Sequence, residues 1–238
     1  MSVLPSPFIL PAVRHVIFDL DGTLTDPFAG ITGCLQHALQ QMGVSPPDKF
    51  ALRGYIGPPL RETLSTLLGT RDAERIELAV MHYRARYAET GLLENELYPG
   101  VPELLERLRL SGCTLYVATS KLQTVARRIT KHFRIDESFE AVFGAHDDGR
   151  FDDKRELLCY LLEAASLDSG SCVMIGDRKY DVEAGRSNGC TTVGLTYGYG
   201  SLEELEGAGA DFICDSPGAI LNLPLFQSTA PQSLGTPG

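Results

Sequence analysis

Short apolar runs recur along the chain, each too brief for a helix and each followed by a polar or turn-forming residue. Continuous apolar runs of this length are typical of β-strands that are covered on both faces, so they predict a buried sheet. The runs with this pattern are 16–18, 115–118, 141–143, 172–175, 192–195 and 212–214.

The segments between the later runs have the spacing of amphipathic helices. In one of them, Leu104, Leu105 and Leu108 repeat at the intervals that place side chains on one helix face. Strands that alternate with helices in this way predict an α/β fold with a doubly wound parallel sheet. The helix-like segments are 102–110, 122–133, 153–165 and 181–188.

One long interval breaks the alternation. From residue 27 to residue 96 the chain has helical periodicity and no strand-like run, which predicts an all-helical insertion after the first strand. The α/β core would then comprise residues 1–26 and 97–226, with the insertion at 27–96. Residues 227–238 are mostly small or polar and have little to bury, so we expect a flexible tail.

Composition and charge narrow the possible partners. Of the 238 residues, 43% are hydrophobic and 22% are charged, which is ordinary for a globular protein. The net charge is −10, so the chain lacks the overall basic character with which proteins bind nucleic acid or anionic membranes, and we expect neither partner. A small anionic substrate is still compatible, because a bound cation can reverse the local field.

The cysteines and the N-terminal segment bear on location. The six cysteines are scattered, without a CxxC pair, which indicates reduced thiols and a cytoplasmic protein. The N-terminus lacks the basic region of a signal peptide, and no uncharged apolar stretch approaches the ~20 residues of a membrane-spanning helix.

The first apolar run ends in two carboxylates. Asp19 and Asp21 follow it two residues apart, and Gly22 comes next. In extended backbone both carboxylates project to the same side, at the carboxyl end of a strand, where open α/β sheets bind ligands. Gly22 would let the backbone turn and let a ligand or metal approach closely. Two such acids suit a division of roles, in which one is a nucleophile or metal ligand and the other transfers a proton. The alternative is an ordinary turn after the strand.

A second acidic pair follows the run 172–175. Gly176 and Asp177 end this run, and Asp181 comes four residues after Asp177. Carboxylates gathered at one sheet edge repel one another, and a divalent cation relieves that repulsion. Because oxygen ligands in small number favour Mg²⁺, we predict Mg²⁺ as the cofactor. Asp181 taken alone could equally be a helix N-cap.

Two further positions offer groups for phosphate. Thr119 follows a strand-like run and can donate its hydroxyl to a phosphate oxygen, while Ser120 and Lys121 are expected to begin a helix whose first amides suit an anion. Lys154 stands at the start of a helix-like segment, where its positive charge interacts unfavourably with the helix dipole. A lysine retained at such a position indicates a function such as binding a phosphoryl group. The alternatives are a routine helix start at Thr119 and a solvated surface lysine at 154.

At these positions the chain resembles the haloacid dehalogenase (HAD) superfamily, whose four motifs appear in order. They are the Asp-Leu-Asp-Gly-Thr segment 19–23, Thr119, Lys154 and the Gly-Asp-x-x-x-Asp segment 176–181. The insertion 27–96 is similar to the cap that follows the first motif in phosphoglycolate-phosphatase-like members. The resemblance implies a doubly wound, Rossmann-like core with an inserted all-helical cap.

The resemblance also implies hydrolysis of a phosphate monoester through an aspartyl-phosphate. Asp19 is expected to be the nucleophile, and Asp21 the general acid and then the general base. Mg²⁺ would be held by Asp19, the backbone carbonyl of Asp21 and Asp177, with Asp181 in a supporting position. The groups expected to bind the phosphate belong to Gly22, Thr119, Ser120 and Lys154. Many relatives have proline after the third-motif lysine, whereas this chain has Arg155, so Lys121 is the alternative to Lys154.

The substrate implied is a small organophosphate, as in phosphoglycolate phosphatases. Arg53 and Arg61 flank a Gly-Pro-rich turn of the insertion and are expected to contact a second anionic group. The segment 144–149 is similar to members assigned as 5′-nucleotidases, so a nucleoside monophosphate is an alternative substrate. A phosphomutase and a non-catalytic binding protein on the same core are further alternatives, and the oligomeric state, monomer or dimer, stays open.

Overall fold

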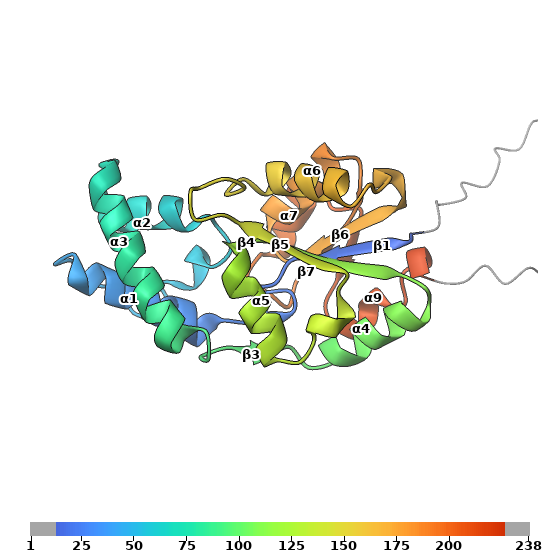
Figure 1. The fold of residues 1–238 in the computed structure, drawn as a ribbon, viewed down its shortest axis with the longest axis horizontal. Coiled ribbons are helices and arrows are strands. Elements are labelled where there is room, and N and C mark those ends of the chain that lie inside the picture. Colours follow the sequence, from blue (N-terminus) through green and yellow to red (C-terminus); the bar gives the residue numbers. More distant parts are fainter. Residues whose placement is uncertain (1–12, 227–238) are drawn as a thin grey trace, which may run out of the picture.

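The computed structural model describes residues 13–226, which form a six-stranded parallel sheet covered by helices on both faces (Figure 1). The predicted flexible tail at 227–238 and the first twelve residues of the predicted core lie outside the described residues. The strand order is β5-β4-β1-β6-β7-β8. The bounds are β1 (His15–Phe18), β4 (Thr114–Leu122), β5 (Ala141–Ala145), β6 (Cys172–Gly176), β7 (Thr191–Leu195) and β8 (Phe212–Cys214).

Apolar residues fill both faces of the sheet because successive side chains of a strand point to opposite sides. In β1, Val16 and Phe18 pack in one core cluster and Ile17 in the other, and all three are fully buried. Helices α6 and α7 cover one face, and α4, α5 and α9 cover the other (Figure 1). The core helices are α4 (Val101–Leu110), α5 (Gln123–His132), α6 (Lys154–Ala164), α7 (Lys179–Ser187), α8 (Leu202–Ala208) and α9 (Pro217–Ile220).

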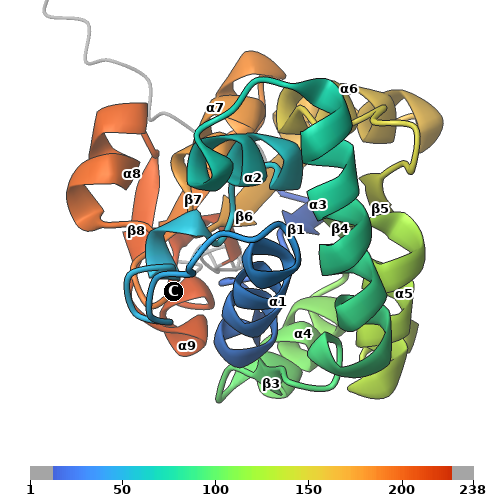
Figure 2. The same cartoon turned by 90° about the vertical axis from the view of Figure 1, so that its left-hand side faces the viewer.

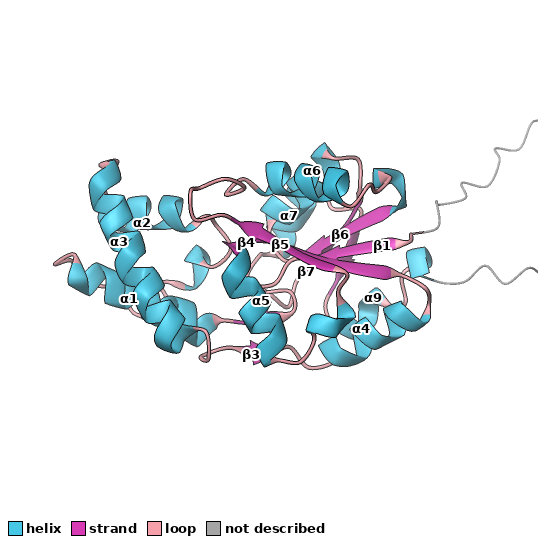
Figure 3. Ribbon diagram, viewed as in Figure 1, coloured by secondary structure: helices cyan, strands magenta, loops and turns pink. Residues whose placement is uncertain are grey.

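The interval without strand-like runs is a helical insertion, here called the cap. It contains α1 (Phe28–Gln41), α2 (Leu60–Leu68) and α3 (Ala73–Arg86), followed by one π-helical turn (Tyr87–Gly91). Figure 2 looks onto these helices, which lie in front of the sheet, and Figure 3 shows them apart from the strands. The predicted α/β class and the all-helical insertion are therefore confirmed.

A two-stranded ladder joins the cap to the core. β2 (Thr25–Asp26) pairs antiparallel with β3 (Glu96–Leu97), so the chain leaves and re-enters the core at the same place. The ladder has no signal in the sequence, because strands of two residues carry no periodicity. The predicted boundary at 26/27 falls at the end of β2, whereas the boundary at 96/97 falls between the two residues of β3.

The topology places one edge of the sheet under the cap. The strand order reverses about β1, since β4 and β5 lie on one side of it and β6, β7 and β8 on the other. Open α/β sheets bind ligands outside the carboxyl ends of the strands at such a reversal. Within the described residues, no helix is long and apolar enough to cross a bilayer.

Candidate active site

The first acidic pair lies at the carboxyl end of β1, in the middle of the sheet. The amide of Asp19 continues the strand ladder by donating to the carbonyl of Ile175 at 2.9 Å. Gly22 then turns the chain with a φ of 84°, in the left-handed region that favours glycine. A Cβ atom at Gly22 would lie 2.2 Å from Oδ2 of Asp177, so only glycine lets the two acidic loops approach this closely.

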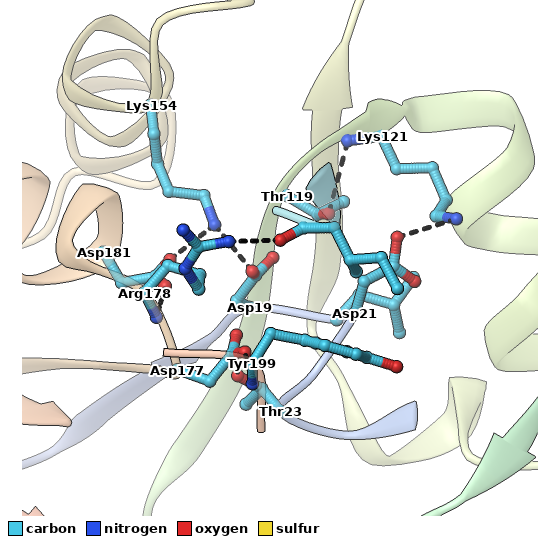
Figure 4. Close-up of polar contacts among 12 residues, drawn as sticks. Asp19, Asp21, Thr23, Thr119, Lys121, Lys154, Asp177, Arg178, Asp181 and Tyr199 are labelled. Carbon is cyan, nitrogen blue, oxygen red and sulfur yellow. Dashed lines mark hydrogen bonds and ion pairs between the residues drawn. The ribbon is translucent and has the colours of Figure 1, made fainter. Parts of the chain in front are cut away.

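Asp19 forms a buried ion pair with Lys154. The Lys154 ammonium lies 2.9 Å from Oδ2 of Asp19 and 2.5 Å from Oδ1 of Asp181 (Figure 4). Burial alone would lower the pKa of Lys154, but the charges of Asp181 and Asp19 raise it above its ordinary value, so the ammonium stays protonated. Lys154 is only 6% exposed, which rules out a solvated surface lysine.

Three buried carboxylates could hold a metal ion together. Asp19, Asp177 and Asp181 each offer an oxygen, and these atoms lie within 4.8 Å of one another. Burial and the charges of Asp181 and Asp19 raise the pKa of Asp177 well above its ordinary value, and burial raises the pKa of Asp181 to about 6. Oδ1 of Asp19 is buried without a hydrogen-bond partner among the described residues. The three carboxylates offer only oxygen ligands, and one of these oxygens has no hydrogen-bond partner. This set of ligands fits Mg²⁺.

Asp181 has two roles in this arrangement. Its Oδ1 pairs with Lys154, while its Oδ2 accepts a hydrogen bond from the amide of Arg178 at 3.0 Å. Arg178 is the N-cap of α7, so Asp181 is the third residue of the helix rather than the N-cap considered from the sequence. It still satisfies a free amide at the helix start, which is the physical purpose of an N-terminal cap.

Asp21 faces the cap side of the same edge and is paired with Lys121. Oδ2 of Asp21 lies 2.8 Å from the Lys121 ammonium (Figure 4). Burial raises the pKa of Asp21 above its ordinary value in spite of the opposing charge of Lys121. Oδ1 of Asp21 is buried without a partner among residues 13–226. The two predicted phosphate lysines thus sit beside different acids, Lys154 beside Asp19 and Lys121 beside Asp21.

The segment after Thr119 differs from the prediction. Ser120 and Lys121 were expected to begin a helix, but β4 continues to Leu122 and α5 begins at Gln123. Pairing with β5 outweighs the local Thr-Ser helix signal, and the register shifts between Thr119 and Leu122. Thr119 is buried, and its Oγ1 accepts a hydrogen bond from the amide of Lys121 at 3.3 Å.

The two cap arginines have other partners. Arg61 pairs with Glu77 and with Asp152 of the core, and it lines the cavity described below. Arg53 donates to the carbonyl of Gly198 at 3.0 Å and is not part of the cavity lining.

One contributor to the site, Tyr199, lies outside the four motifs. The amide of Tyr199 donates to Oδ2 of Asp177 at 2.7 Å and holds that carboxylate in place. Gly198 and Gly200 flank it, and a Cβ atom on either would lie within 2.4 Å of Asp177. The Gly-Tyr-Gly pattern was the available signal, because two glycines around one residue indicate a close backbone approach.

A cavity of about 380 Å³ extends from the carboxylates into the cap. Asp19, Asp21 and Thr119 lie at its core end, whereas aromatic and aliphatic side chains dominate its cap end. The cap residues that line it include Ile31, Leu35, Tyr55, Pro58, Leu60, Thr63, Val80, Tyr83, Arg84 and Tyr87. The site can therefore hold a phosphate at the sheet edge and a bulky group under the cap.

Comparison with known proteins identifies the family. The family model described as haloacid dehalogenase-like hydrolase matches residues 16–195. The chain therefore belongs to this family, as the four motifs predicted.

Individual relatives cover most of the chain. A 5′-nucleotidase of Pseudomonas aeruginosa is 46% identical over 191 residues, which is 80% of this chain and 86% of the relative. The tyrosine-protein kinase PtkA of Mycobacterium tuberculosis is 40% identical over 192 residues, 80% of this chain and 65% of that protein. A crystal structure of a predicted phosphatase from Clostridium acetobutylicum superposes with a TM-score of 0.85 at 36% identity, covering 89% of this chain and 99% of the other.

Proposed function

We propose that this chain hydrolyses phosphate monoesters, with Asp19 as the nucleophile. The observation that carries the proposal is the buried Asp19–Lys154 pair, in which Asp19 lines the core end of a substrate-sized cavity and lies beside two further carboxylates. An Asp19 oxygen attacks phosphorus, and the bond between phosphorus and the ester oxygen breaks. The products of this step are an aspartyl-phosphate and an alcohol.

Asp21 is the proposed general acid and base. It gives its proton to the departing ester oxygen, and the resulting carboxylate then takes a proton from water. That water attacks phosphorus and releases inorganic phosphate and the Asp19 carboxylate. The raised pKa of Asp21 favours the protonated form that the first step needs.

The proposed metal and phosphate contacts combine the cluster of buried acids with the family motifs. Asp19, Asp177 and the backbone carbonyl of Asp21 would hold Mg²⁺, with Asp181 in support. The ion would supply positive charge that offsets repulsion between the nucleophile and the phosphoryl oxygens. Lys154 is the preferred phosphate lysine, because its ammonium already touches the nucleophile. The other proposed phosphate contacts are Gly22, Thr119 and Ser120.

The cavity favours a nucleoside monophosphate over phosphoglycolate as substrate. Its volume of about 380 Å³ falls in the usual range for ligand sites of about 300–1,000 Å³, and glycolate would fill little of it. Among the basic side chains of the lining, Arg61, Arg84 and Lys121 are already paired with carboxylates, and Arg128 is exposed. A substrate that has a carboxylate in addition to its phosphate would therefore find little unpaired positive charge inside.

The test is release of inorganic phosphate by the full chain with Mg²⁺. The esters compared are 5′-AMP, 5′-CMP, phosphoglycolate and phenyl phosphate. We expect turnover of phenyl phosphate and a higher kcat/KM for a nucleotide than for phosphoglycolate. Absence of phosphate release from every ester would overturn the proposal. Conversion of β-glucose 1-phosphate to glucose 6-phosphate without phosphate release would identify a phosphomutase instead.

A cytoplasmic location also belongs to this proposal, and every described cysteine is free.

A further inference from the structure

The cap end of the cavity contains a buried hydroxyl without a partner. Thr63 lies in α2, is 3% exposed and lines the cavity. Its Oγ1 has no hydrogen bond to any described residue. Burying a hydroxyl without a partner destabilises a protein, so such a group in a binding cavity needs an explanation.

Other helical threonines of the cap make a hydrogen bond that Thr63 lacks. Thr66 in the same helix donates to the carbonyl of Glu62 at 3.0 Å, and Thr32 in α1 donates to the carbonyl of Phe28 at 2.5 Å. This bond to the preceding helical turn is the ordinary local solution for a threonine. Thr63 makes no such bond.

A second unpartnered polar atom belongs to the same cavity. Nε of Arg84, in α3, is buried without a partner among the described residues, while Nη1 of Arg84 pairs with Asp147 at 3.3 Å. A guanidinium nitrogen can only donate, so its missing partner is an acceptor. The hydroxyl of Thr63 can donate or accept.

The same cavity also has flat, apolar walls. Tyr83 and Tyr87 stack with ring centroids 5.7 Å apart and an interplanar angle of 10°, and both line the cavity. Leu60 and Val80 add apolar surface to the lining of the same cavity. The combination suits a ligand with a flat apolar body and a polar edge, since apolar walls give affinity and a few polar groups give specificity.

We infer that Thr63 is a specificity-determining residue whose hydroxyl bonds a polar ring atom of the leaving group, with Arg84 Nε as a second contact. The leaving group class that matches is a nucleoside, whose base offers ring nitrogens and carbonyl oxygens on a flat body. This inference rests on the proposed phosphatase function and adds to it the side chain that recognises the base.

The experiment compares the variants Thr63→Val and Thr63→Ser with the unaltered chain. Valine keeps the shape and removes the hydroxyl, and serine keeps the hydroxyl. The substrates are the four 5′-ribonucleoside monophosphates and phenyl phosphate, which has a flat leaving group without a polar edge. The matched control is Thr66→Val, because Thr66 lies in the same helix and is exposed.

In Thr63→Val, kcat/KM for the best nucleotide should fall about tenfold, while that for phenyl phosphate should stay within about twofold. Thr63→Ser should retain the nucleotide preference, and Thr66→Val should leave both substrates unchanged. The free nucleoside should also inhibit phenyl phosphate hydrolysis about tenfold more weakly in Thr63→Val.

The inference is overturned by equal losses on both substrates, by no loss, or by a serine variant as impaired as the valine variant. It is also overturned if the unaltered chain hydrolyses phenyl phosphate but prefers no nucleotide, in which case the phosphatase function stands. Failure of the unaltered chain on every ester would instead defeat the proposed function itself.

Discussion

The ammonium of Lys121 lies 2.8 Å from Oδ2 of Asp21, at the end of β4. The same nitrogen donates to the hydroxyl of Tyr87 at 2.7 Å and lies 4.3 Å from the centre of its ring. Tyr87 belongs to the cap, so one core lysine connects the proposed acid–base residue with the domain that covers it. The position of the cap and the placement of Asp21 are thereby linked through a single charged group.

Lys121→Met should lower kcat/KM for phenyl phosphate by at least about tenfold, which corresponds to about 1.4 kcal/mol. The reason is that the carboxylate form of Asp21, which the second step needs, loses its counter-charge, and the cap loses a contact. Tyr87→Phe keeps both the ring and the Lys121–Asp21 pair, so its loss should be smaller. Steady-state kinetics of the two variants check this, and equal activity of Lys121→Met and the unaltered chain would contradict the link.

Asp19→Asn should lower Mg²⁺-dependent hydrolysis of phenyl phosphate by at least about 10³-fold, because an amide cannot form the aspartyl-phosphate. Circular dichroism should show an unchanged fold. Mass spectrometry has to exclude deamidation back to aspartate. Full activity of a verified asparagine variant would remove Asp19 as the nucleophile.

Removal of Mg²⁺ by EDTA should stop turnover, and added Mg²⁺ should restore it. The ion should also raise the melting temperature of the unaltered chain, because a ligand that binds only the folded state stabilises it. Asp177→Asn removes one proposed ligand and should abolish most of this thermal shift. Turnover that is indifferent to EDTA would exclude the metal from the reaction.

Glu204 provides a stability prediction away from the carboxylate cluster. Burial alone would raise its pKa, but Arg178 at 2.9 Å and the amide of Lys179 outweigh burial and hold the pKa of Glu204 below its ordinary value. A carboxyl with a depressed folded pKa contributes stability above its unfolded pKa of about 4.3 and loses that contribution as the pH falls through the folded pKa.

Glu204→Gln should therefore destabilise the chain at pH 7, and the difference from the unaltered chain should shrink as the pH falls below about 4. Urea unfolding at both pH values measures this difference. The exposed Glu203→Gln is the matched control and should have little effect at either pH. A difference that is constant with pH would show that the Glu204 charge does not contribute.

Local pattern was enough to predict the architecture. The run 16–18 predicted a strand buried on both faces, and β1 contributes alternate side chains to the two core clusters. The long helical interval predicted the cap, because periodicity over many residues needs no partner to be recognised. The two-residue ladder of β2 and β3 and the extension of β4 past Thr119 depend on pairing with distant strands, so local signals missed them.

The features of the candidate site also divide into those that the sequence determined and those that only the tertiary structure decided. The order of residue types along the chain determined which acids stand at strand ends and that Lys154 stands at a helix start. It thereby determined the acidic edge that the structure contains. Only the tertiary structure decided which lysine pairs with which acid, that Tyr199 holds Asp177, and that Thr63 faces the cavity unpaired. These relationships join segments far apart in the sequence, and they depend on distances of a few ångströms that no local pattern encodes.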